Sequence, residues 1–113
     1  MKFLPEQRPI SAFGDGGFRF GDHSHRGDLL ILPSGMRAWD GEDYSGIFSE
    51  VADLDFVIIG TGSGFQRISN ALAQRFATAG LSADAMTTAA AVRTYNLMLG
   101  DARRVAAALR AVP

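Results

Sequence analysis

A chain of 113 residues has room for one domain built around one hydrophobic core. Its ordinary composition, 47% hydrophobic and 20% charged, excludes a disordered tail and a coiled-coil rod, and the absence of cysteine excludes disulfides, a thiolate nucleophile and Cys-ligated zinc. The net charge of −1 argues against nucleic-acid binding, and the arginines are scattered singly, so only the fold could gather them into a basic patch.

The N-terminal residues 1–9 lack the apolar region of a signal peptide, and we expect them to be a loosely ordered segment of a single domain spanning 1–113. The longest apolar run, Val105–Leu109, is far too short to cross a membrane. These features predict a cytoplasmic protein without direct membrane insertion.

The first half of the chain has the pattern of β-strands. Ile10–Phe13 and Phe18–Phe20 alternate in polarity around the turn-forming residues Gly14–Gly17, which predicts a hairpin. Leu29–Leu32 is an unbroken apolar run, typical of a strand buried on both faces. Met36–Trp39 is expected to form a further short strand.

The second half alternates strands and helices. A short helix over Ile47–Leu54 precedes a buried strand at Phe56–Ile59. The glycine-rich segment Gly60–Gly64 then leads into a helix near Gln66–Ala79, whose apolar residues recur every three to four positions. A short strand at Leu81–Asp84 follows.

The next helix is predicted over Thr88–Leu99, with Thr87 or Thr88 as its N-cap. The alanine-rich segment Arg103–Leu109 is ambiguous. Alanine propensity favours a helix, whereas the preceding strand–helix–strand–helix order favours a third strand.

Five blocks of the sequence, in order, resemble the small family of unknown biochemical function that includes mitochondrial NADH dehydrogenase (complex I) assembly factor 3 and many bacterial proteins. The resemblance covers about Ile10 to Leu109. The residues that carry it are Gly14–Phe20; Gly27, Pro33 and Trp39; Gly60–Gly62; Met86–Asn96; and Arg104–Leu109.

This resemblance implies a three-layer α/β domain with a mixed central sheet, flanking helices and an extra N-terminal β-hairpin layer. It also implies that Arg104–Leu109 is the final strand, and we adopt that interpretation. For function it implies a non-enzymatic assembly or interaction factor whose protein partners belong to the assembly of a membrane complex. Eukaryotic relatives are mitochondrial.

The turn Gly60-Thr61-Gly62 is the first candidate site, because amides at a strand-to-helix turn suit an anion or phosphate. A dinucleotide fingerprint would need glycine where Phe65 stands, although Asp84 lies where a ribose-binding acid would fall. The alternative is a tight structural turn.

Two further patterns concern histidines. Ser63 beside a strand-to-helix turn could be a nucleophile with His23 or His25 as its base. The same histidines, with Asp22 or Asp28, could bind a metal. Histidines in strands and loops more often bind nothing, so we expect no metal, cofactor or catalytic group.

A second candidate cluster follows the next strand: Thr87, Thr88, Arg93 and Asn96. The threonines could cap the helix, Arg93 could pair with Asp84, and Asn96 needs hydrogen-bond partners if buried. Alternatively these residues complete a ligand pocket with the glycine turn, with an anion between Thr61 and Thr87.

The sequence therefore leaves two functions open. The first is a non-enzymatic interaction factor, which predicts an exposed apolar patch. The second is a small-molecule or anion-binding module, or an uncharacterised enzyme, that uses the Gly60-Thr61-Gly62 turn and the helix start at Thr87. We also expect the hairpin and the N-terminal strands to leave an exposed edge, covered either by a second copy of the chain or by a loop.

Overall fold

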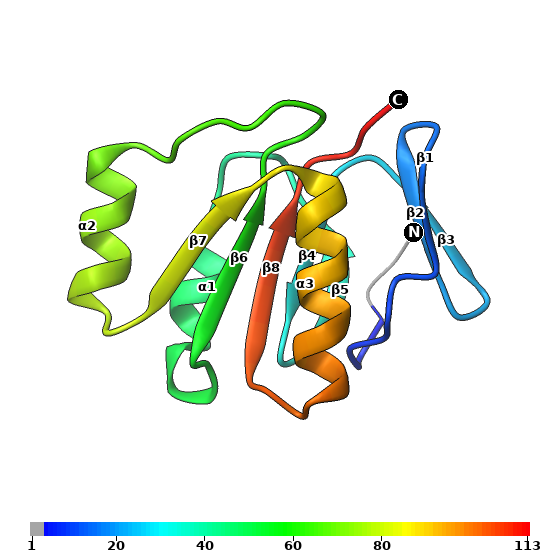
Figure 1. Cartoon of the computed structure of the whole chain (residues 1–113). Helices are drawn as coiled ribbons and strands as arrows, with labels where there is room; N and C mark the ends of the chain where they lie inside the picture. Colours follow the sequence, from blue (N-terminus) through cyan, green and yellow to red (C-terminus); the bar gives the residue numbers. More distant parts are fainter. Residues whose placement is uncertain (1–3) are drawn as a thin grey trace.

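The computed structural model describes residues 4–113 as two β-sheets and three α-helices, and so confirms the α/β class (Figure 1). The smaller sheet has the strand order β1-β2-β3, and the larger has the order β5-β4-β8-β6-β7. The elements are β1 (Ala12–Gly14), β2 (Gly17–Phe20), β3 (His23–Arg26), β4 (Leu29–Leu32), β5 (Gly35–Ala38), α1 (Ser45–Ser49), a 3₁₀ turn (Val51–Asp53), β6 (Phe56–Gly60), α2 (Asn70–Thr78), β7 (Ser82–Met86), α3 (Thr88–Gly100) and β8 (Val105–Leu109).

The predicted hairpin forms the smaller sheet. Its first turn places Asp15 and Gly16 at positive φ, 51° and 80°, where glycine and aspartate are tolerated best. Strands β1, β2 and β3 pair antiparallel, with Phe13 opposite Phe18 and Phe18 opposite His25. The smaller sheet lies at one end of the molecule and α2 at the other (Figure 1).

The ambiguous C-terminal segment is strand β8, which confirms the interpretation taken from topology and family. It lies inside the larger sheet, antiparallel to β4 and parallel to β6. All five of its residues are buried, with Val105, Ala107 and Leu109 on one face. Burial on both faces overrides the helix propensity of alanine, because small side chains allow helices to approach the sheet closely.

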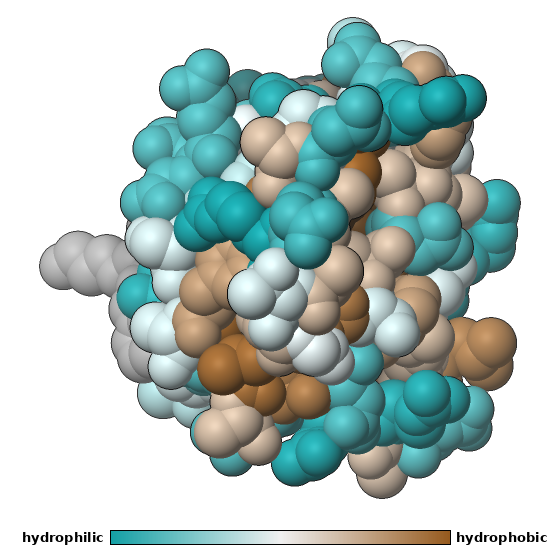
Figure 2. Space-filling model, turned by 90° about the vertical axis from the view of Figure 1, so that its left-hand side faces the viewer, coloured by the Kyte–Doolittle hydropathy of each residue, from teal (hydrophilic) through white to brown (hydrophobic). Residues whose placement is uncertain are grey.

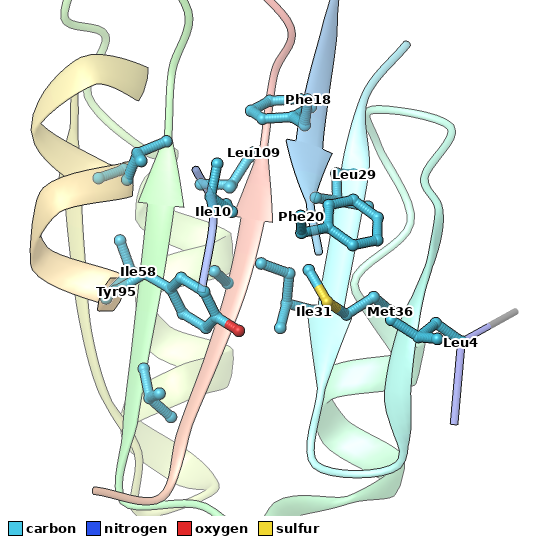
Figure 3. Close-up of a cluster of buried hydrophobic side chains, with 14 residues drawn as sticks. Leu4, Ile10, Phe18, Phe20, Leu29, Ile31, Met36, Ile58, Tyr95 and Leu109 are labelled. Carbon is cyan, nitrogen blue, oxygen red and sulfur yellow. The ribbon is translucent and has the colours of Figure 1, made fainter. Parts of the chain in front are cut away.

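Two hydrophobic cores lie on opposite faces of the larger sheet. On one face, β4, β6 and β8 pack against α3 and the inner face of the smaller sheet, where Phe18, Phe20 and Tyr95 are buried (Figure 3). On the other face, the same strands pack against α1 and α2 around Ile47 and Phe76. The expected three-layer arrangement follows from these two interfaces.

Helix α2 begins later than the sequence pattern predicts. Its first residue is Asn70 rather than a residue near Gln66, because the side chain of Ser69 accepts a hydrogen bond from the Leu72 amide at 3.1 Å and acts as the N-cap. Residues 61–69 are therefore a loop, and the Gly60–Gly64 turn does not lead directly into a helix.

The N-terminal segment crosses the molecule between α3 and β5. The Tyr95 hydroxyl donates to the Arg8 carbonyl at 2.8 Å, and the amides and carbonyls of Leu4 and Met36 bond reciprocally at 2.8 Å, which covers the outer edge of β5. The sequence predicts that residues 1–9 are loosely ordered. Residues 4–9 of this segment make specific contacts, and residues 1–3 lie outside the described part. Within residues 4–113 no helix is long and apolar enough to cross a membrane.

Candidate functional site

The two predicted turns lie side by side, as the parallel pairing of β6 and β7 requires. The Thr61 amide donates to the Met86 carbonyl at 2.8 Å, and the Thr88 amide donates to the Gly62 carbonyl at 2.9 Å. The Gly62 amide in turn donates to Oγ1 of Thr88 at 2.9 Å. We call this set of bonded residues (Thr61, Gly62, Met86, Thr88) the turn junction.

Hydroxyl groups at the turn junction bond to the protein itself. The Thr88 side chain is fully buried, and its hydroxyl donates to the Arg110 carbonyl at 2.7 Å. Oγ1 of Thr61 lies 2.9 Å from the Gly64 carbonyl and accepts from the Gln66 amide at 3.1 Å. Since these groups are already bonded, an anion between Thr61 and Thr87 would compete with existing bonds.

Thr87, Arg93 and Asn96 lie on or beside α3. Thr87 is the N-cap, with its hydroxyl accepting from the Ala90 amide at 3.4 Å. Asn96 bonds the Ile10 backbone in both directions, each at 2.8 Å, and thereby fixes the N-terminal segment. Arg93 is exposed and forms no ion pair with Asp84 in the described part of the chain.

Ser63 and the histidines lie in different parts of the fold. Ser63 is exposed in the loop 61–69, whereas His23 and His25 lie on β3 of the smaller sheet. Nε2 of His25 bonds the Asp28 carbonyl at 2.8 Å, while its Nδ1 is buried without a hydrogen-bond partner in residues 4–113. Across these residues no three His, Asp or Glu side chains gather as metal ligands.

One surface hollow, which we call the helix groove, lies between α1 and α2. It has a volume of about 300 Å³ and is bordered by Phe48 of α1 and by Gln74, Arg75, Thr78 and Ala79. The Phe48 ring stacks on buried Phe76 at 5.0 Å, and the Arg75 guanidinium lies over the Phe48 ring at 4.4 Å. The exposed atoms of this lining are mainly apolar, although Gln74 and Thr78 carry polar groups, and Arg75 adds one cation.

The second hollow, which we call the sheet hollow, lies on the smaller sheet. Its volume is about 480 Å³, and all its lining residues belong to that sheet or to the β1–β2 turn. Two exposed arginines, Arg19 and Arg26, border it together with Asp15 and Phe13. The sequence did not identify this group, although strand alternation around the hairpin indicates that Arg19 points away from buried Phe18 and Phe20.

The titratable groups with shifted pKa values lie outside both hollows. Burial raises the pKa of the Tyr95 and Tyr44 hydroxyls. A side-chain hydrogen bond from Arg104 lowers the pKa of exposed Asp55.

A mixed five-stranded sheet, helices on both faces and an added three-stranded sheet define a class of small α/β domain. Comparison with known proteins identifies that class further. Residues 10–110 match the family model described as protein of unknown function, DUF498/DUF598. The chain belongs to this family.

Relatives and solved structures agree with this assignment. An uncharacterized protein of Rhodobacter capsulatus is 34% identical over 106 residues, which cover 93% of this chain and 86% of that protein. A crystal structure described as an outer membrane protein from Bartonella henselae has a TM-score of 0.93 and 40% identity, covering 96% of this chain and 98% of that chain. An NMR structure from Rhodopseudomonas palustris has a TM-score of 0.84 and 37% identity, covering 100% of this chain and 90% of that chain.

More distant structures share the fold alone. A Bordetella pertussis protein described as a Mth938-like domain has a TM-score of 0.75 at 19% identity, covering 98% of this chain and 92% of that chain. The resemblance noted in the sequence is thus confirmed at the level of a family of unknown function, and these descriptions name no complex I assembly factor.

Proposed function

We propose that this protein is a non-enzymatic interaction factor that assists the assembly of a membrane complex by docking a protein partner at the helix groove. The observation that carries the proposal is the apolar groove itself. Figure 2, which views the molecule from the side of α2, shows residues of high hydropathy gathered in the lower part of this face, with hydrophilic residues around them. Grouped apolar surface of this kind marks interaction sites more often than isolated exposed residues do.

The chemistry of the groove defines its occupant. Phe48 and Ala79 offer an apolar floor, and the Arg75 guanidinium over the Phe48 ring offers a cation that forms no ion pair in residues 4–113. An apolar side chain of a partner protein with a neighbouring carboxylate fits this surface, because burying the apolar group provides affinity and the charge pair provides orientation.

Complex I is the assembly that the family resemblance points to, and the cytoplasm is the compartment we propose for this chain. The test is deletion of the gene in the source cell, followed by measurement of assembled complex I on native gels. We expect less assembled complex in the deletion strain. Normal assembly in that strain would reject the assembly role.

Rescue variants connect the role to the groove. Thr78→Glu places a charge in the helix groove, while Ala77→Glu places the same charge on the neighbouring exposed residue of α2, outside the lining. We expect wild type and Ala77→Glu to restore assembly, and Thr78→Glu to fail while keeping its melting temperature. Equal rescue by both variants would show that the groove is not the docking surface.

The second candidate is an anion- or small-molecule-binding module at the turn junction, together with Thr87, Arg93 and Asn96. It is favoured by the adjacency of the two turns. Native mass spectrometry of the purified chain would support it by showing a bound small molecule that Thr61→Val and Thr87→Val release. Strand β7 also has an unpaired outer edge among the described residues, which is where we place self-association into a homodimer. Sedimentation showing only monomer would reject the dimer.

A further inference from the structure

The alternation of side chains across the smaller sheet separates a buried face from an open one. Phe18, Phe20 and His25 are buried, whereas Arg19, Ser24 and Arg26 are exposed. Most of the residues that line the sheet hollow alternate to the open face, although buried Phe18 and His25 also border it, so the hollow lies mainly on the open face.

The floor of the sheet hollow is made of small residues. On the open face Ala12 lies opposite Arg19, which in turn lies opposite Ser24, and Gly14 lies opposite Gly17. A Cβ at Gly17 would meet the His25 carbonyl oxygen at 2.2 Å, so the backbones approach too closely there for a larger residue. Gly14 and Gly17 therefore leave this part of the hollow without side chains from β1 and β2.

Two cationic side chains, Arg19 and Arg26, border this floor. Neither Arg19 nor Arg26 has a carboxylate within ion-pair distance in residues 4–113, and the contact of Arg26 is a long bond of 3.5 Å to the Asp15 carbonyl. Gly17 pairs with Arg26 and Arg19 with Ser24, so the two arginines are diagonal neighbours on the same face, roughly 7–8 Å apart. Asp15 also lines the hollow and is the one carboxylate facing it.

We propose that the open face of the smaller sheet binds an extended acidic segment of a protein partner, with Arg19 and Arg26 each pairing with a carboxylate. In an extended chain, side chains at positions i and i+2 point the same way and lie about 6.8 Å apart, which matches the diagonal spacing of the arginines. The hollow spans three strands, more than one phosphate group would fill.

This inference rests on the proposed function, in that it assigns the chain a protein partner, but it concerns a different surface. The smaller sheet and α2 lie at opposite ends of the molecule (Figure 1). A chain with one apolar groove and one cationic sheet face can hold two partner segments at once, which is what an assembly factor needs to bring subunits together.

The test uses the full chain and a fluorescent peptide that alternates Glu with Thr, with a peptide of Gln and Thr as its uncharged control. We expect Arg19→Gln/Arg26→Gln to weaken binding about tenfold or more. The control Arg67→Gln/Arg103→Gln removes the same charge from two exposed arginines outside the hollow, and it should weaken binding less than about twofold. Amide shifts should appear at Gly14, Gly17 and Ser24.

Several results would overturn this inference. The wild type could fail to bind the Glu peptide, both double variants could weaken peptide binding equally, or the amide shifts could appear outside the smaller sheet. Inorganic phosphate or anionic vesicles shifting the same amides while the peptide does not would assign the hollow to a small anion or a membrane instead. If the peptide test fails but Thr78→Glu still prevents rescue of complex I assembly, the proposed function stands and only this inference is rejected. If the deletion strain assembles complex I normally, the proposed function alone is rejected.

Discussion

The turn junction and the sheet hollow both concentrate hydrogen-bond donors, but they use them differently. At the turn junction, buried Thr88 bonds the Gly62 amide and the Arg110 carbonyl, so its polar groups join β6, β8 and α3 to one another. In the sheet hollow, the guanidinium groups of Arg19 and Arg26 are exposed and unpaired with any carboxylate of residues 4–113. Hydrogen-bond donors therefore do not by themselves indicate a ligand site. Donors that are still free to bond to another molecule do indicate one.

The largest expected effect comes from Thr88→Val, which keeps the shape of the buried side chain and removes its hydroxyl. The Gly62 amide and the Arg110 carbonyl then lose their partner, and we expect a loss of about 3 kcal/mol in the free energy of unfolding. Urea denaturation measures it.

Thr87→Val is the matched control, because this hydroxyl only caps α3 through a bond of 3.4 Å. The substitution should lower the free energy of unfolding by about 1 kcal/mol or less. Equal losses for the two variants would contradict a structural role specific to the turn junction.

Gly60→Ala tests how closely the turn junction is packed. A Cβ at this position would lie 2.9 Å from Cδ2 of Leu109 and 3.1 Å from both Cβ of Ala91 and Oγ1 of Thr88. We expect overpacking to cost about 2 kcal/mol in the free energy of unfolding.

The same substitution at Gly64 meets no atom within 4 Å and should change stability by less than about 0.5 kcal/mol. Thermal melts of the two variants side by side give the comparison. A neutral Gly60→Ala would show that the junction has space for a ligand after all.

Asn96→Ala tests the contact between α3 and the N-terminal segment. Loss of both bonds to the Ile10 backbone should cost about 1–2 kcal/mol and accelerate hydrogen exchange at the Ile10 amide. Arg93→Ala, one turn earlier on the same helix and exposed, should change neither quantity. If Asn96→Ala left exchange at Ile10 unchanged, the proposed fixing of the segment would be wrong.

The smallest effect concerns an exposed ion pair, Asp55 with Arg104, joined at 2.8 Å. The Arg104 hydrogen bond lowers the pKa of Asp55 in the folded state, so its contribution is complete above the ordinary value of 3.8 and is lost as the pH falls through the folded-state value. The melting temperatures of wild type and Arg104→Gln should differ slightly at pH 7 and converge in acid. A difference that grew in acid would reverse the sign and contradict the assignment.

Much of the fold follows from local patterns in the sequence. Unbroken apolar runs predicted β4 and β6, glycine and aspartate predicted the hairpin turn, and threonine followed by an apolar stripe predicted α3. The start of α2, predicted near Gln66 directly after the glycine segment, was wrong because the Ser69 cap decides it. Capping by a single side chain is a weaker signal than apolar periodicity.

The candidate sites were harder to predict for a different reason. Adjacency of Thr61 and Thr88 followed from parallel strand order, but their bonding partners, such as the Arg110 carbonyl, come from a segment far away in sequence. Arg19 and Arg26 belong to different strands, and only the register between β2 and β3 brings them to one face. The two-residue turn Gly21–Asp22 sets that register by placing His23 opposite Phe20.

The most direct measurement of the difference between the two regions is an amide NMR titration of the full chain with the peptide that alternates Glu and Thr. We predict shifts at Gly14, Gly17 and Ser24, which border the sheet hollow, and unchanged signals at Gly62 and Thr88, whose groups are bonded within the protein. Shifts at Gly62 and Thr88 with an unchanged smaller sheet would contradict it and assign binding to the turn junction.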